Sequence, residues 1–407
     1  MSGEFGLGIA LLSVAIWVGL LAVWGGFWRC DQRLEGEKFK SQNSPTPSPL
    51  PSSSPTPSSP LPFVCAVIPA RNEADVLPVT LRSLLCQSYP GAFQIVLVDD
   101  QSTDGTGAIA QETAAALGKA AQLTVLDSEP LPAGWTGKLW AMEQGVRHTR
   151  TMTTQPDYLL LTDADIEHDP DNLQRLVAKA QQDDRDLVSL MVLLRCQSVW
   201  EKLLIPAFVF FFQKLYPFPL VNNPHKRVAA AAGGCSLIRR TALERIGGLQ
   251  VLRQALIDDC TLAQKVKMSS RRIWLGLTQS TRSVRPYDSL QTIWDMVART
   301  AYTQLNYSPF WLVGTVLGMT LVYLVSPIAA IIGLVTANWM LSLAGVAGWA
   351  LMTLAYFPTI RLYRLSPLWA VCLPAIAFLY NLMTIDSAIR HWRGKGGAWK
   401  GRVYPSV

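Results

Sequence analysis

The sequence predicts an α/β protein in which a doubly wound sheet domain lies between apolar N-terminal and C-terminal segments long enough to span a membrane. Strand-like and helix-like segments alternate between residues 63 and 194, and uncharged runs lie at both ends of the 407-residue chain. Half of the residues are hydrophobic and only 16% are charged, against about 25% in ordinary soluble domains. This composition excludes a disordered or fibrous chain and points to a membrane protein with a soluble part.

The first apolar run covers residues 6–28, which contain no charged side chain. A run of this length spans about 30 Å of hydrocarbon as a helix. Basic residues follow it, beginning with Arg29 and Arg33, so the positive-inside rule places the N-terminus outside and the following chain in the cytoplasm. We therefore expect an anchor over residues 1–30. A cleaved signal peptide is the alternative, although it needs a positive segment before the apolar run.

A Pro/Ser-rich segment follows the anchor and reads QNSPTPSPLPSSSPTPSSPLP over residues 42–62. Such a composition cannot bury a core and favours extended, solvated backbone. Residues 31–62 are therefore predicted to be a disordered linker, with a proline-motif docking site as the alternative.

The next region, residues 63–305, has the pattern of a domain with a parallel sheet. Predicted strands alternate with helices predicted at 73–87, 107–120 and 171–182. The strands are expected at 63–70, 94–100, 123–127, 157–166 and 186–194. Ligands bind at the carboxyl ends of strands in such sheets, and two of these strands end in acidic residues.

Residues 199–221 are apolar, but Lys202, Lys214 and three prolines make them a poor membrane span. We expect an interfacial helix here, and a buried core helix is the alternative. The C-terminal region, residues 306–388, contains apolar runs at 309–335, about 338–360 and 366–385.

A basic tail, residues 389–407, follows these runs. Three full spans would place it outside, against the positive-inside rule. One run is therefore expected to be re-entrant or interfacial, and 366–385, with Pro367 and Pro374, is the candidate.

The first acidic cluster is Asp99 and Asp100, at the end of a predicted strand and before the turn sequence QSTDGT. A carboxylate here can accept hydrogen bonds from a base or a ribose, and Arg71, after the preceding strand, can pair with a phosphate. The same pattern is also typical of an Asx-turn with helix caps.

The second cluster is Asp163 and Asp165, at the end of an apolar strand. Two carboxylates this close repel each other unless a cation lies between them. One or two carboxylates together with substrate phosphates are the usual ligands of Mg²⁺, so this pair predicts a Mg²⁺ or Mn²⁺ site. A solvated acidic turn is the alternative.

The third cluster is Asp258 and Asp259, which open a predicted helix after the glycine pair Gly233 and Gly234. The glycines permit close approach of the backbone to a ligand. Acidic residues at a helix start are ordinary caps, but as the third acidic site in series this pair predicts a catalytic base.

Taken together, these motifs resemble the inverting family 2 glycosyltransferases of the GT-A fold, over residues 63–305. Within that family the chain is most similar to the hopene-associated glycosyltransferase group, and it resembles ceramide glucosyltransferases more distantly. The order of the motifs carries the resemblance: IPARNE (68–73), VDDQSTDGT (98–106), GWTGKLWAMEQG (134–145), TDADI (162–166), GGCSLIRR (233–240) and IDDC (257–260).

The resemblance implies roles for individual residues. It implies a metal ligand at Asp165, with Asp163 near the ribose, donor sugar and metal, and a general base at Asp259 preceded by Asp258. The residues that it places around the nucleotide-sugar donor are Ala70, Arg71, Glu73, Asp100, Lys138, Asp163, Gly234 and Arg299.

One motif departs from the family pattern. Processive and ceramide-type relatives carry Q/R-x-x-R-W after the base, and the corresponding stretch here keeps Arg299 but has Met296 and Thr300 at the outer positions. The tryptophan helps to form the acceptor floor in those relatives, so its absence weakens any expectation of polymer synthesis. Arg299 is expected to contact phosphate or Asp259, or to be a juxtamembrane basic residue.

We therefore expect a multi-pass membrane enzyme with its catalytic domain in the cytoplasm. It would transfer a sugar from a UDP- or GDP-sugar to the hydroxyl of a lipid, possible acceptors including a hopanoid. The alternatives are a transferase acting on a polyprenyl phosphate and a catalytically weak, membrane-tethered nucleotide-binding scaffold. The basic excess lies mostly near the apolar segments, which indicates contact with anionic lipid, and no nucleic-acid-binding motif is present.

Overall fold

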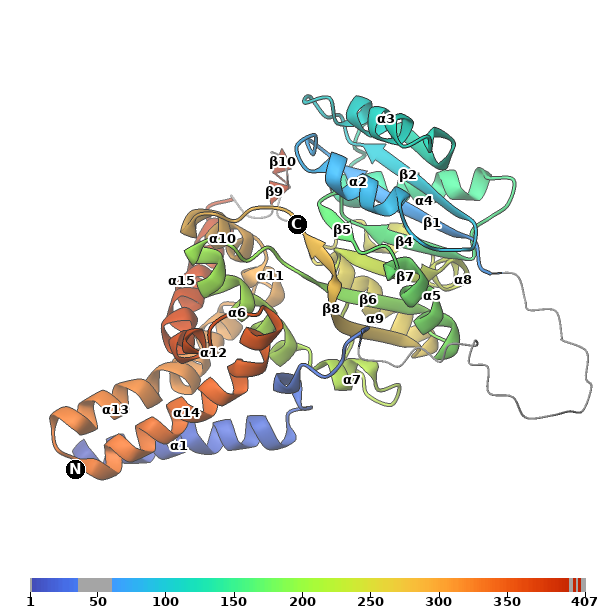
Figure 1. The fold of residues 1–407 in the computed structure, drawn as a ribbon. Helices are drawn as coiled ribbons and strands as arrows, with labels where there is room; N and C mark the ends of the chain where they lie inside the picture. Colours follow the sequence, from blue (N-terminus) through green and yellow to red (C-terminus); the bar gives the residue numbers. More distant parts are fainter. Residues whose placement is uncertain (1, 36–60, 395–397, 400–401, 404–407) are drawn as a thin grey trace, which may run out of the picture.

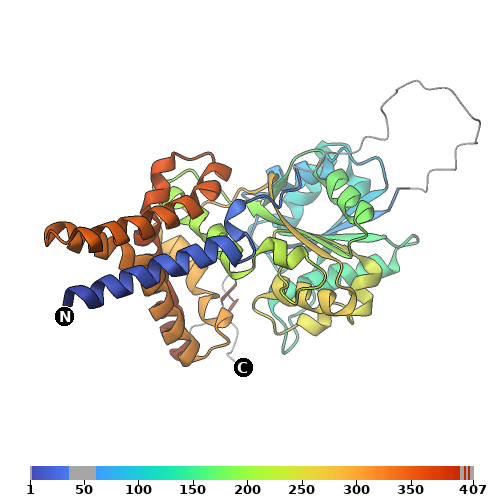
Figure 2. The same ribbon diagram turned by 90° about the horizontal axis from the view of Figure 1, so that it is seen from below.

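The computed structural model describes residues 2–35, 61–394, 398–399 and 402–403, and it divides them between a sheet domain and a group of apolar helices (Figure 1). Figure 2 shows the two parts side by side, with α1 (Ser2–Val23) lying along the helical part. The sheet domain begins at β1 (Val64–Ala70). The α/β class and the apolar terminal helices predicted from the sequence are confirmed.

The sheet has eight strands in the order β3-β2-β1-β4-β7-β6-β8-β5. It is mixed, whereas the sequence predicted a parallel sheet: β7 runs antiparallel between β4 and β6, and β5 runs antiparallel to β8. The strands other than β1 are β2 (Phe93–Asp99), β3 (Leu123–Asp127), β4 (Tyr158–Thr162), β5 (Ile166–His168), β6 (Leu187–Leu193), β7 (Cys235–Arg239) and β8 (Ile273–Ser283).

The sequence predicted a parallel sheet because two short antiparallel strands were not recognised. Residues 157–166 were predicted as one strand, but the chain turns at Asp163–Asp165, and the short strand β5 pairs at the far edge of the sheet. The stretch that forms β7 was noticed for its glycines, because five residues are too few to show a strand pattern.

Both faces of the sheet are covered, which explains the continuous apolar run in β1. Its alternate residues Cys65 and Val67 pack in one core with α4 (Gly137–Thr151). Val64, Ala66 and Ile68 pack in the other core with α2 (Leu77–Leu85). Successive side chains of a strand point to opposite faces, so a strand buried on both faces needs apolar residues at every position.

The remaining helices fall into two groups. The sheet domain also contains α3 (Thr106–Ala116), α5 (Asn172–Gln182), α7 (Phe218–Asn222), α8 (Arg240–Arg245) and α9 (Asp258–Ser270). The helical part contains α1, α6 (Val199–Leu215), α10 (Leu290–Ala298), α11 (Ala301–Gln304), α12 (Pro309–Met319), the π-helical turn η4 (Thr320–Leu324), α13 (Val325–Val335), α14 (Trp339–Leu362), the 3₁₀ segment η5 (Pro367–Cys372) and α15 (Leu373–Trp392).

Helices α1, α13 and α14 lie side by side at the end of the molecule away from the sheet (Figure 1). Glycines permit the close contact between α13 and α14, because a Cβ atom on Gly345 would lie 2.2 Å from the backbone nitrogen of Ala330. Across α1 and α13, the buried hydroxyls of Ser13 and Ser326 are 2.9 Å apart. Small residues and short polar contacts of this kind are typical of helix packing in membranes.

Four helical segments of the described chain are long and apolar enough to cross a membrane. They are Glu4–Val23, Pro309–Val335, Trp339–Leu362 and Pro367–Trp392. The first ends five residues before the predicted limit of the apolar run, because Gly25 and Gly26 adopt positive φ angles of 62° and 60°.

The segment predicted as an interfacial helix forms α6, and most of its residues are buried or half-buried. It contacts α10, α14 and α15, and its Phe210 packs against Phe27 and Tyr356. This packing favours the alternative of a buried helix. The sequence pattern did not decide between the two, because both kinds of helix are apolar with a few polar residues.

The predicted linker, residues 31–62, is described only at its two ends, and residues 36–60 lie outside the described part. Residues 31–35 are ordered against β8, whereas they were predicted to be disordered. The carboxylate of Glu35 accepts hydrogen bonds from the backbone nitrogens of Gln279 and Ser280 at 2.7 and 2.9 Å. The basic tail is described to residue 394 and at 398–399 and 402–403.

The chain after α14 enters the helical part and returns. At its start, the Gln279 side chain of β8 donates to the carbonyl of Leu362 at 2.9 Å. Val371 then lies beside Trp349, whose indole donates to its carbonyl at 3.0 Å, about 20 Å back along α14 at 1.5 Å per residue. The last turns of α15 reach α10, where Trp294 donates to Asp386 at 2.7 Å. These residues also belong to a segment long enough to cross a membrane, so the re-entrant or interfacial segment predicted at 366–385 stays a prediction.

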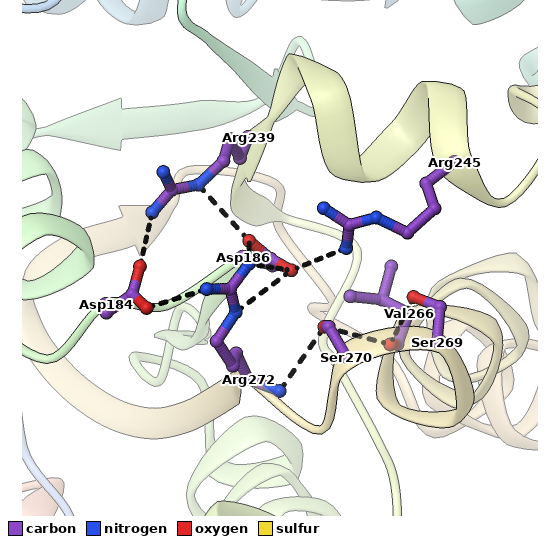
Figure 3. A network of polar contacts seen from close by, with 8 residues as sticks. All are labelled: Asp184, Asp186, Arg239, Arg245, Val266, Ser269, Ser270 and Arg272. Atoms are coloured by element: carbon purple, nitrogen blue, oxygen red, sulfur yellow. Dashed lines mark hydrogen bonds and ion pairs between the residues drawn. The ribbon is translucent and has the colours of Figure 1, made fainter.

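A buried ion network joins three strands at the edge of the sheet opposite the acidic strand ends (Figure 3). The fully buried carboxylate of Asp186 pairs with Arg239, Arg245 and Arg272 at 3.2, 3.0 and 2.9 Å. Burial by itself raises the pKa of Asp186, but hydrogen bonds from Ser270 and the guanidinium groups outweigh it and hold the pKa below its usual value. The network is therefore stabilising in the ionised state.

We predict that Asp186→Asn destabilises the protein by about 2–3 kcal/mol, because it removes the buried anion to which three partly exposed guanidinium groups make charged hydrogen bonds. Thermal or denaturant unfolding in detergent measures the loss. Because the folded-state pKa is lowered, the native contribution is present above about pH 4 and is lost as the pH falls further. Glu244→Gln, which breaks the partly exposed pair with Arg240, is the matched control and should cost less than about 0.5 kcal/mol. Equal losses in the two variants would contradict the prediction.

Candidate active site

The second and third acidic clusters meet at one edge of the sheet because β7 lies beside β4. Thr162, the last residue of β4, is in register with Cys235, the first residue of β7. The Thr162 hydroxyl donates to the carbonyl of Gly234 at 2.8 Å. The turn that carries Asp163 therefore lies directly against the glycine pair. This is the proximity that the two acidic clusters need in order to form one site.

Lys138, in the first turn of α4, lies between the two clusters. Its amine is 2.7 Å from Asp163 and 4.0 Å from Asp258. Burial lowers the pKa of Lys138, but the carboxylates of Asp163, Asp258 and Asp259 outweigh it, so the pKa is raised and the amine stays charged. Burial also raises the pKa of Asp163, against the opposing effect of Lys138. The lysine offsets the repulsion among the carboxylates.

Asp259, in the first turn of α9, is held by backbone donors. The nitrogens of Gly233 and Cys260 donate to its two oxygens at 2.8 and 2.7 Å. A Cβ atom at Gly233 would lie 3.3 Å from the Lys138 amine and 3.5 Å from an Asp259 oxygen, so the backbone here lies close to both side chains. Burial, followed by the charge of Asp258, raises the pKa of Asp259 to about 6. A carboxylate with this pKa suits proton removal near neutral pH.

Asp165, in the turn between β4 and β5, is held by one residue at the end of β8 and one just after this strand. Ser283 and Arg285 both donate to its Oδ2 atom at 3.0 Å. The same guanidinium donates to both oxygens of Glu73 at 2.7 Å. Arg285 therefore connects the predicted metal ligand with a residue of the predicted nucleotide-binding motif.

The predicted nucleotide-binding residues at the ends of β1 and β2 are mostly buried inside the sheet domain. The side chains of Ala70 and Asp100 are fully buried, and the guanidinium of Arg71 lies 3.7 Å from the Asp100 carboxylate. Asp99 accepts hydrogen bonds from the nitrogens of Ser102 and Gly107. Asp99 thus accepts hydrogen bonds from its own loop, in line with the Asx-turn alternative. A role in nucleotide binding stays a prediction for Ala70, Arg71, Glu73 and Asp100.

A cavity of about 820 Å³ joins the acidic site to the apolar helices. Seven predicted site residues line it: Lys138, Asp163, Asp165, Gly234, Asp258, Asp259 and Arg299. Gly233, the other member of the glycine pair, also lines it. Ala70, Arg71, Glu73 and Asp100 are not among its lining residues. The cavity continues between α1, α6, α12 and α15, where Leu20, Phe211, Met319 and Tyr380 line it. One end is therefore acidic and the other apolar.

Met296, Arg299 and Thr300, at the end of α10 and just beyond it, also line this cavity. The stretch that departs from the family motif thus lies where the acidic and apolar parts meet. Arg299 is exposed and forms no ion pair within the described residues.

The acidic residues fit a divalent cation that is completed by its substrate. Among the described residues, no group of three or more His, Cys, Asp or Glu side chains is placed to hold a metal ion. Asp165 keeps its Oδ1 atom free of the contacts made by Arg285 and Ser283, and Asp163 lines the same cavity. Mg²⁺ commonly uses one or two carboxylates together with substrate phosphates, and this pair matches that mode.

Sequence reasoning missed two basic residues of the site. Arg285 lies two residues after β8, and the strand itself had not been recognised, so its position at the acidic edge was not apparent. Lys214 was noted only as a charge that interrupts an apolar run, and it lines the cavity. The only sequence signal was a basic residue inside or beside an apolar segment.

Comparison with known families now identifies the class of protein. Residues 65–247 match the family described as Glycosyl transferase family 2, and residues 158–383, more than half of the chain, match Glycosyl transferase family group 2. The chain belongs to the family 2 group of glycosyltransferases. It is therefore an enzyme of the transferase class, as the sequence predicted.

Individual relatives include the undecaprenyl-phosphate 4-deoxy-4-formamido-L-arabinose transferases. The chain is 32% identical to the enzyme of Pseudomonas aeruginosa over 192 residues, which are 46% of this chain and 49% of the relative. It is 30% identical to the Klebsiella pneumoniae enzyme over 145 residues, which are 35% and 41% of the two chains. The chain spans about half the length of the curated relatives it matches.

Among solved structures, the chain resembles the mannosyltransferase PcManGT from Pyrobaculum calidifontis in complex with GDP-Man and Mn²⁺. The TM-score is 0.51 at 18% sequence identity, and the match covers 95% of this chain and 99% of that one. At this identity the likeness establishes the fold, which is the GT-A fold predicted from the sequence.

We predict that Arg285→Gln weakens metal-dependent nucleotide binding. The change removes the guanidinium that orients Asp165, and loss of such a supporting contact typically costs about 10–100-fold in metal affinity. Titration of Mn²⁺ in the presence of UDP or GDP, followed by calorimetry, measures the metal concentration needed for half-maximal binding.

The matched control is Arg282→Gln, near the end of β8, whose guanidinium pairs with Glu167 and Asp169. Arg282 is not among the residues that line the cavity. It should leave the metal requirement unchanged. An unchanged or stronger response to Mn²⁺ in Arg285→Gln would show that Arg285 does not organise Asp165.

Proposed function

We propose that this protein is a membrane-bound inverting glycosyltransferase that moves a sugar from a nucleotide-sugar donor, a UDP- or GDP-sugar, to the hydroxyl of a lipid. The supporting observation is the continuous cavity, which has four carboxylates at one end and apolar helices at the other. A donor diphosphate fits the acidic end when a cation accompanies it, and hydrocarbon fits the apolar end. An enzyme with a water-soluble acceptor has no need of the second part.

Asp259 is the proposed general base. As the acceptor oxygen attacks the anomeric carbon, Asp259 takes its proton, and the bond between that carbon and the nucleoside diphosphate breaks. Attack comes from the face opposite the leaving group, so the anomeric configuration inverts in one displacement. Asp258, whose charge raises the pKa of Asp259, strengthens the base.

Asp165 and Asp163 are the residues that would hold a Mg²⁺ or Mn²⁺ ion. When bound, the cation neutralises charge on the leaving diphosphate. Lys138, 2.7 Å from Asp163, opposes the effect of burial on the pKa of that carboxyl. Arg299, which lines the cavity without an ion pair in the described chain, is available to the diphosphate as a charged donor.

The catalytic domain is proposed to face the cytoplasm. The start of α1 and the turn between α13 and α14 lie together at the far end of the helical part, where Gly6 approaches Leu341. Arg29 and Arg364 lie at the other end, toward the sheet, and the end of α15 returns there with Arg390. The basic residues thus collect on one side, as the positive-inside rule requires of the cytoplasmic side.

A polyprenyl phosphate is the second candidate acceptor. It is favoured by the relatives, which are named for transfer to undecaprenyl phosphate, and it supplies an oxygen that needs no base. A hopanoid acceptor rests on the sequence resemblance alone. A nucleotide-binding scaffold without activity is the remaining alternative, and the following prediction separates it from the enzyme.

We predict that Asp259→Asn lowers sugar transfer by about 10²–10⁴-fold, because a general base typically contributes that much. Asp165→Asn should lower it too, through loss of the metal. Purified protein is assayed with lipid extract, a panel of UDP- and GDP-sugars, and Mn²⁺ compared with Mg²⁺. In the native enzyme the rate should fall as the pH drops below about 6, because Asp259 becomes protonated.

Asp171→Asn is the control, because Asp171 pairs with Arg175 on the surface of α5. Transfer at the native rate by both Asp165→Asn and Asp259→Asn would reject the mechanism. If Asp259→Asn alone is fully active, the nucleophile needs no base, which favours a phosphate acceptor.

A further inference from the structure

The apolar end of the cavity contains one basic residue, Lys214, in the last turn of α6. It lines the cavity together with Leu20 of α1, Trp24 just after that helix, Leu215 of α6 and Met319 of α12. Its amine donates to the hydroxyl of Tyr323 at 3.0 Å and lies 4.6 Å from the centre of that ring. Lys214 belongs to none of the motifs predicted to form the active site, and the proposed sugar transfer does not use it.

Lys214 has no carboxylate partner within the described chain. Within the described residues, the amine makes its polar and aromatic contacts with one side chain, that of Tyr323. Lys138, at the other end of the same cavity, has Asp163 and Asp258 beside it. A charged amine among apolar helices is costly, and charged residues in such positions usually have a partner or a function. The surroundings of Lys214 therefore leave a place for an anion from outside the chain.

The amine is held in position by the membrane-facing helices. The Trp24 indole donates to the carbonyl of Lys214 at 2.8 Å, which fixes the end of α6 against the end of α1. Tyr323 packs edge-on against Trp17 and Phe211, with ring centres 5.4 and 5.6 Å apart. The direct contacts of Lys214 include none of the residues that hold Asp259, which are Gly233 and Cys260.

We propose that Lys214 binds a phosphate group of the lipid that enters the cavity, so that the enzyme selects a phosphate-bearing lipid over a neutral one. The proposal rests on the proposed function and specifies its acceptor. A lysine ammonium is a compact charge suited to phosphate, and the Tyr323 hydroxyl, which accepts from Lys214, can donate its own proton to the same group. Phosphate is also the anion that lipids carry at the border of the hydrocarbon.

Two lipids supply this chemistry. In a glycerophospholipid with a hydroxyl in its headgroup, the phosphate lies between the hydrocarbon and the accepting oxygen, which matches a lysine at the apolar end and a base at the other. In a polyprenyl phosphate, the phosphate itself is the nucleophile, and Lys214 would hold it on its way to the donor. A neutral polycyclic alcohol offers nothing to the amine.

The test measures lipid binding by the full-length protein in neutral detergent, apart from catalysis. Radiolabelled undecaprenyl phosphate is the probe, and undecaprenol is the neutral comparison. The native protein should bind the phosphate lipid more tightly than the alcohol, and Lys214→Met should weaken only the former, by about 10–100-fold, the range of a hydrogen bond to a charged group. Unlabelled phosphatidylglycerol competes for the site if a glycerophospholipid is the source, and fails to compete if the source is the polyprenyl phosphate.

Lys202→Met is the matched control, because Lys202 lies near the start of the same helix and does not line the cavity. It should leave lipid binding unchanged, and Lys214→Arg should retain most of the selectivity. Binding of UDP or GDP with Mn²⁺ checks that each variant is folded, and Lys214→Gln serves if Lys214→Met does not fold.

Equal binding of the phosphate lipid and the alcohol by the native protein would overturn the proposal, as would an unchanged ratio in Lys214→Met and Lys214→Gln. Its failure is distinguishable from failure of the proposed function. Selective lipid binding without sugar transfer to any lipid rejects the transferase function, whereas transfer that is indifferent to Lys214 rejects only the phosphate site.

Discussion

The repulsion among four carboxylates at one edge of the sheet is the constraint on which the rest of the site depends. Asp163, Asp165, Asp258 and Asp259 all line one cavity. Carboxylates this crowded raise one another's pKa values or require cations, and the chain supplies two cations. Lys138 pairs with Asp163 and lies near Asp258, and Arg285 pairs with Asp165. The negative charge that remains suits the proposed divalent cation, through which a diphosphate would bind.

The antiparallel strand β7 makes this arrangement possible. It lies between two strands that run the opposite way, so its start, rather than its end, reaches the acidic edge. Gly233 and Gly234 therefore stand beside Asp163 and offer a backbone nitrogen to Asp259. A carboxylate that is buried, held by two nitrogens and close to a second carboxylate keeps a raised pKa without losing its orientation, and both properties are needed by a base.

The sheet and the apolar helices form one structure and not a domain on a tether. Helix α6 is buried between them, Glu35 closes the chain after α1 onto β8, and Gln279 ties the end of α14 to the same strand. The cavity crosses this junction. The proposed lipid acceptor would reach the acidic site through this cavity, which Lys214 also lines.

Much of this protein follows from the sequence by itself. Periodicity and charge-free runs fixed the α/β class and the apolar helices, since burial on both faces of β1 demands apolar residues throughout. The acidic pairs stood out because they end apolar strands. The family followed from the order of the motifs.

Only the tertiary structure decided the rest. The orientation of β7, the split of residues 157–166 into β4 and β5, and the placing of Arg285 and Lys214 all arise from contacts between segments far apart in the chain. A strand of three or five residues has too little periodicity to be recognised, and a single basic residue has no pattern at all. The role of these short strands and single basic residues depends on their neighbours in space, which are brought together only when the chain folds.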